Sequence, residues 1–141
     1  MQIWLAHRPV EQHDGHQNGA ALRTRAAADA LHDCIVEVNR NAGVYEITNV
    51  AIERPAGMGL DKLLPIYGAL CAIVPRRMSV TGMTASEWRK TLGAGPTKTS
   101  GHEAVADIAF SGIVIEYDEH ELDSIGLALA YRQMLHQAVA A

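Results

Sequence analysis

Val50-Ala51-Ile52-Glu53-Arg54-Pro55 places a carboxylate directly after a short apolar run. The pattern predicts a strand over residues 45–53, because β-branched residues fill its end and a stretch rich in Pro and Gly follows it. In α/β sheets, ligands collect at the carboxyl ends of the strands. Glu53 is therefore the first candidate for a site residue.

The segments on both sides of this strand have the periodicity of helices. From residue 19 to residue 39, apolar side chains recur at intervals of three, four or seven, which predicts an amphipathic helix. A second helix is predicted over residues 60–73, with an irregular first turn because Pro65 lies within it. Strand 45–53 thus lies between two helices.

The rest of the chain continues the alternation of strands and helices. A helix carrying Trp88 has Thr84 and Ser86 as alternative N-caps, and we expect Trp88 to pack in a core rather than stack on bases. Alternating strands and helices indicate an α/β layered fold with parallel pairing. The other predicted elements are strands at 3–6, 78–81 and 113–115 and helices at 101–110 and 121–139.

Length and composition indicate a single globular domain over residues 1–141. No apolar run approaches the roughly 20 residues that a bilayer-spanning helix needs, so no membrane association is expected. Residues 1–9 lack the pattern of a secretory signal. The expected location is the cytoplasm.

Charge is unevenly distributed along a chain whose formal net charge is −4. Residues 76–98 contain five basic side chains and one acidic side chain, whereas residues 103–123 contain seven acidic side chains and no Lys or Arg. The first segment has the character of a phosphate-binding surface and the second that of a cation-binding surface. Two solvated surfaces are the alternative explanation.

An acidic cluster opens the last predicted helix, in Tyr117-Asp118-Glu119-His120-Glu121-Leu122-Asp123. His120 and Asp123 are three residues apart and would share a helix face. Carboxylate oxygens are the ligands that Mg²⁺ prefers. The alternative is structural, because acidic residues at a helix N-terminus stabilise its dipole by about 0.3–1 kcal/mol each.

The order of these pieces resembles the RuvC-like Holliday-junction resolvases of the RNase H-like nuclease superfamily. In that family a glutamate follows an apolar strand, as Glu53 does here, and the domain closes with Asp or His, two residues, Asp and a helix of small residues. The closing pattern reads here as 120–130, from His120 through Asp123 to Ala130. The resemblance extends from about Ala20 to Gln133.

The resemblance implies an RNase H-like mixed sheet flanked by helices, and a DNA endonuclease that depends on Mg²⁺ or Mn²⁺. Glu53, His120 and Asp123 would be its metal-site and catalytic residues, cleaving branched or structured DNA by a two-metal mechanism. Lys98 would face the DNA backbone, and Arg89 and Lys90 of the basic segment would assist it. A homodimer is implied because many resolvases cut two strands symmetrically.

One departure from the family concerns its first strand, which ends in a metal-binding aspartate. Residues 1–6 contain no acid, and Asp14 follows no apolar strand. Either the chain begins downstream of the family's true start, or Asp14 or another acid substitutes, or catalysis has been lost. We favour a truncated or degenerate copy, in which residues 3–6 would be the family's second strand.

Two other functions are consistent with the same sequence. A nucleic-acid-binding module would keep the basic segment 76–98 and do no chemistry. An assembly protein would use the sheet edge left open by the absent strand, because unpaired edges are templates for pairing with another chain.

Overall fold

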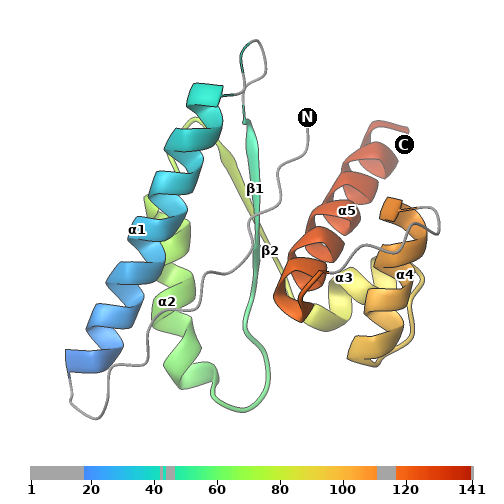
Figure 1. The fold of residues 1–141 in the computed structure, drawn as a ribbon, viewed down its shortest axis with the longest axis horizontal. Coiled ribbons are helices and arrows are strands. Elements are labelled where there is room, and N and C mark those ends of the chain that lie inside the picture. Colours follow the sequence, from blue (N-terminus) through green and yellow to red (C-terminus); the bar gives the residue numbers. More distant parts are fainter. Residues whose placement is uncertain (1–17, 42, 44–46, 111–116, 141) are drawn as a thin grey trace. The chain divides into compact units, whose positions relative to one another are not determined.

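The computed structural model describes residues 18–41, 43, 47–110 and 117–140. Within this part the fold is mixed α/β and mostly helical, with five helices and one two-stranded parallel sheet (Figure 1). The described residues form two compact units, one ending at Gly82 and the other beginning at Met83. None of the described helices combines the length and the apolar character that a bilayer-spanning helix requires.

The first unit is a strand–helix–strand motif preceded by a long helix. Helix α1 (Asn18–Asn41) leads to strand β1 (Asn49–Glu53), helix α2 (Leu60–Ile73) and strand β2 (Ser79–Met83). The strands pair in parallel, and the Ser79 N–H donates to the Thr48 carbonyl oxygen at 2.9 Å. Helix α2 packs against both α1 and β1. Parallel strands need such a crossover, because a tight turn cannot join them.

The core of this unit is built on the alternation of side chains along β1. Val50 and Ile52 are buried, whereas Asn49 and Glu53 are exposed. The buried pair packs with Ile35 of α1 and with residues that follow α2. The remaining members of this core are Val74 and Met78, with Leu31, Ile47, Tyr67, Leu70 and Cys71 partly buried against it. Glu53 therefore ends the strand on the side away from the core.

The second unit consists of three helices. Helix α3 (Ala85–Thr91) and helix α4 (Lys98–Phe110) both pack against α5 (Glu119–Ala140). Of the two predicted caps for α3, Thr84 is correct: its hydroxyl accepts from the Glu87 N–H, and the Glu87 carboxylate accepts from the Thr84 N–H at 2.7 Å. This reciprocal capping box satisfies two backbone donors that the helix leaves unpaired.

Trp88 occupies the centre of the second unit. Its side chain is fully buried, as are those of Val105 on α4 and Ile125 on α5. Two glycines allow the indole to approach the neighbouring backbones, since a Cβ on Gly126 would lie 2.7 Å from the ring and one on Gly101 would lie 2.9 Å from it. Trp88 is thus a core residue, as the sequence predicted.

Several predicted boundaries differ from the observed ones. Helix α4 begins at Lys98 rather than 101, because Thr97 caps it by accepting from the Ser100 N–H at 3.1 Å, and Gly101 is therefore a buried helical residue. Helix α5 begins two residues earlier than predicted, and β2 spans 79–83 rather than 78–81. The predicted strands at 3–6 and 113–115 lie outside the described residues.

The packing of Trp88 predicts that Gly126→Ala destabilises the protein. Alanine favours helix by about 1 kcal/mol over glycine, but overpacking a filled core costs about 1–3 kcal/mol. Because the fully buried indole has no room to withdraw, we expect the overpacking cost to outweigh the helix preference. The net loss in the free energy of unfolding, measured by urea denaturation, should be up to about 2 kcal/mol.

The matched control is Gly68→Ala in α2, where an added Cβ meets no atom within 4 Å. Here only the helix preference acts, so the variant should be unchanged or more stable by up to about 1 kcal/mol. Equal effects of the two substitutions would contradict the close approach of Trp88 to Gly126.

Candidate functional site

Two of the acidic residues at the start of α5 cap the helix. Oδ1 of Asp118 accepts from the N–H groups of His120 and Glu121, each at 2.8 Å. Glu121 Oε2 in turn accepts from the Asp118 N–H at 3.0 Å. Both carboxylates therefore satisfy backbone donors at the helix N-terminus. For these two residues the structural explanation of the acidic cluster is correct.

Two other acidic residues, Glu119 and Asp123, converge on Lys98 of α4. The Lys98 Nζ lies 2.8 Å from Glu119 Oε2 and 3.4 Å from Asp123 Oδ2. Glu119 and Asp123 are four residues apart, so they lie on one face of α5. One ammonium group thus bridges two carboxylates that project from the same side of a helix.

His102 of α4 binds the other oxygen of Asp123. Its Nε2 lies 2.9 Å from Asp123 Oδ1, and the side chains of His102 and Asp123 are only 15% and 23% exposed. A carboxylate only accepts hydrogen bonds, so Nε2 carries the hydrogen in this pair. Lys98 and His102 are also four residues apart, and the face of α4 that they share therefore meets the Glu119 and Asp123 face of α5.

The hydrogen bond between Lys98 and Glu119 shifts the pKa of both groups. The hydrogen bond to Glu119 raises the pKa of Lys98, and the same bond lowers the pKa of Glu119. A lowered carboxyl pKa stabilises the fold above the ordinary glutamate pKa, and this stabilisation is lost as the pH falls through the lowered value. Because 75% of the Glu119 side chain is exposed, the pair adds little to stability.

The three residues predicted to hold metal are divided between the two units. Glu53 is exposed at the carboxyl end of β1 in the first unit. In the second unit His120 is exposed in the first turn of α5, and Asp123 lies partly buried one turn further. The predicted metal site that joins all three stays a prediction.

The predicted DNA-binding residues have different surroundings. Lys98 is held by Glu119 and Asp123, whereas Lys90 is exposed in the last turn of α3. Arg89 is half-buried: its guanidinium donates to the Pro96 carbonyl oxygen at 3.1 Å and lies 5.3 Å from the Trp88 ring centroid. These contacts support the fold around Trp88, and DNA binding by the three residues stays a prediction.

The donors around Lys98 have the chemistry that a hard divalent cation needs. Mg²⁺ is commonly held by one or two carboxylates with water and phosphate oxygens. Glu119 and Asp123 supply two carboxylates directed at one cation, which is the Lys98 ammonium. Among the described residues no group of three or more His, Cys, Asp and Glu side chains is arranged to hold a metal ion. The residues fit Mg²⁺ bound with water or phosphate, and they do not fit a structural zinc site.

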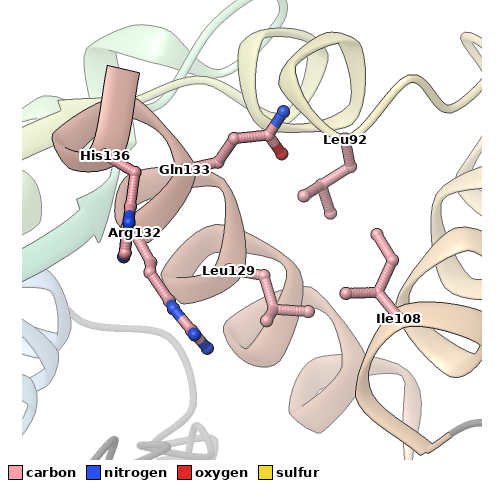
Figure 2. Close-up of a pocket in the computed structure, with 6 residues that line it drawn as sticks. All are labelled: Leu92, Ile108, Leu129, Arg132, Gln133 and His136. Atoms are coloured by element: carbon pink, nitrogen blue, oxygen red, sulfur yellow. The ribbon is translucent and has the colours of Figure 1, made fainter. Parts of the chain in front are cut away.

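A separate depression of about 440 Å³ lies elsewhere in the second unit (Figure 2). Three apolar side chains line it, one from the C-cap of α3, one from α4 and one from α5, together with three polar side chains of α5. Its residues are Leu92, Ile108, Leu129, Arg132, Gln133 and His136. None of them is a predicted site residue, and the depression is open to solvent.

Comparison with known proteins adds no family assignment. No protein-family model matches the sequence, and a search of curated proteins found no match.

The capping role of Asp118 predicts the effect of Asp118→Ala. Loss of an N-cap costs about 0.5–2 kcal/mol, because the backbone donors of the first turn lose their acceptor. We expect a decrease of that size in the free energy of unfolding, measured by urea denaturation. Asp107→Ala, an exposed change in the last turn of α4, is the control and should have a much smaller effect. Equal effects would show that Asp118 is not a cap.

The bridge from Lys98 predicts a pH titration at Glu119. In carbon NMR, the Glu119 carboxyl should titrate below the pH range of an ordinary glutamate, and Lys98→Met should move its midpoint upward. Lys62→Met, at an exposed position of α2, should leave the midpoint unchanged. An unchanged midpoint in Lys98→Met would exclude the bridge in solution.

Proposed function

We propose that this chain is an endonuclease of the RuvC-like type, with an RNase H-like fold, that cleaves branched or structured DNA and depends on Mg²⁺, with Mn²⁺ as a substitute. The strand–helix–strand order of the first unit supports the proposal, since Glu53 ends β1 at the carboxyl edge where ligands collect in parallel sheets. The resemblance to this family implies a homodimer, and the expected location stays the cytoplasm.

The observation that carries the proposal is the environment of Asp123. Unlike Asp118 and Glu121, it caps no backbone donor within the described residues. Its carboxylate is partly buried, one oxygen is held by His102, and the other faces the Lys98 cation. This is the aspartate of the closing His120-Glu121-Leu122-Asp123 pattern. A carboxylate oriented toward a cation is what a metal-dependent nuclease needs at this position.

The residues would have distinct roles. Glu53, His120 and Asp123 would hold Mg²⁺, whose chemistry in such a site is activation of water and stabilisation of the leaving oxygen. Lys98 would exchange its carboxylate partners for a DNA phosphate when the cation binds. Lys90 would contact the DNA backbone. Arg89, whose guanidinium donates to the Pro96 carbonyl oxygen, would assist DNA binding from the same segment.

The decisive experiment compares this chain with Asp123→Asn on a labelled four-way DNA junction in Mg²⁺. Cleavage by the wild-type chain should fall at least about 100-fold in the variant, because the lost carboxylate is central to metal binding and charge stabilisation. The control is Asp107→Asn, an exposed change on α4, which should cleave as the wild type does.

The outcomes separate the proposal from its alternatives. Junction binding without cleavage, unaffected by chelator, would identify a nucleic-acid-binding module. Concentration-dependent self-association with neither Mg²⁺ nor DNA bound would identify an assembly protein. Cleavage that Asp123→Asn does not reduce would place the active site elsewhere.

A further inference from the structure

We propose that His102 is a positioning residue for the active site, which orients the Asp123 carboxylate for cation binding. The inference rests on the proposed function and adds to it a residue that belongs to none of the motifs in the sequence. The observation behind it is the 2.9 Å contact between His102 Nε2 and Asp123 Oδ1.

The contact restricts a side chain that would otherwise rotate. The Asp123 carboxylate is bound at Oδ1 by His102, whose side chain is 15% exposed, and at Oδ2 by Lys98, whose side chain is 40% exposed. A long lysine at the surface holds its partner weakly, because it gives up side-chain entropy to stay in place. His102 follows the buried Gly101 on α4 and is the less exposed of the two partners.

The geometry gives the two carboxylate oxygens different tasks. With Oδ1 held by the imidazole, Oδ2 stays on the side where the Lys98 ammonium lies. A divalent cation that replaces the ammonium would meet an oxygen that is already oriented. Hydrogen-bonded partners of metal-binding carboxylates act in this way, and their loss typically weakens metal binding or activity by about 10–100-fold.

The test compares three substitutions of His102 by the affinity of the chain for Mn²⁺, measured by electron paramagnetic resonance without DNA. The amide N–H of the glutamine in His102→Gln can replace the Nε2 donor. The Mn²⁺ affinity of this variant should therefore stay within about 3-fold of wild type, well short of the roughly 10–100-fold loss that follows removal of such a contact. His102→Asn places its donor too short, and His102→Leu has none, so both should bind about 10–100-fold more weakly. His136→Leu, an exposed change on α5, is the control and should bind as wild type does.

A second comparison tests whether the effect passes through Asp123. In an Asp123→Asn background, His102→Asn should cause no further loss of Mn²⁺ affinity, since the oriented carboxylate is gone. Circular dichroism shows which variants fold, and if His102→Leu does not, the pair of amides at position 102 decides the question.

The outcomes distinguish this inference from the proposed function. Equal affinities for His102→Gln and His102→Asn would overturn the positioning role, whether both match wild type or both are weak. If Asp123→Asn lowers Mn²⁺ affinity while all His102 variants bind normally, the inference fails and the proposed function stands. If the wild-type chain does not bind Mn²⁺, both fail.

Discussion

The second unit depends on the burial of one large side chain, Trp88, against two helices. The indole fills the space among α3, α4 and α5, and Gly101 and Gly126 let it approach the backbones of α4 and α5. Because protein interiors are packed to near-crystalline density, a fit of this kind sets the separation and the rotation of the helices it joins. The contacts between the facing surfaces of α4 and α5 depend on that placement.

The polar cluster is one consequence of the placement. Each helix presents two residues four apart, Lys98 and His102 on α4 and Glu119 and Asp123 on α5. Gly101, adjacent to His102, lies beneath the indole. Packing and chemistry are therefore linked, because a shift of α4 along α5 would break the contacts to Asp123 as well as the core. Phe110 and Tyr117 stack at 4.8 Å at the other end of α4, close to the start of α5, and reinforce the same alignment.

The acidic cluster at the start of α5 divides into two kinds of residue. Asp118 and Glu121 satisfy backbone donors, whereas Glu119 and Asp123 face a cation from α4. The basic surplus of residues 76–98 and the acidic surplus of residues 103–123 partly neutralise each other through this contact. Lys98 connects the two segments, because the ion pair brings the last basic residue of one against the acids of the other.

The order of the described elements, the strand that ends in Glu53 and the burial of Trp88 were predictable from the sequence, because periodicity and local turn chemistry act over a few residues. The sequence did not reveal His102. Gly101 was expected to start a helix that in fact begins at Lys98, and this hid the spacing of four that places Lys98 and His102 on one face. Which acids are caps and which meet a cation depends on how α4 packs on α5, so the tertiary fold sets it. Contacts between residues 21 positions apart are set by packing, which no local pattern encodes.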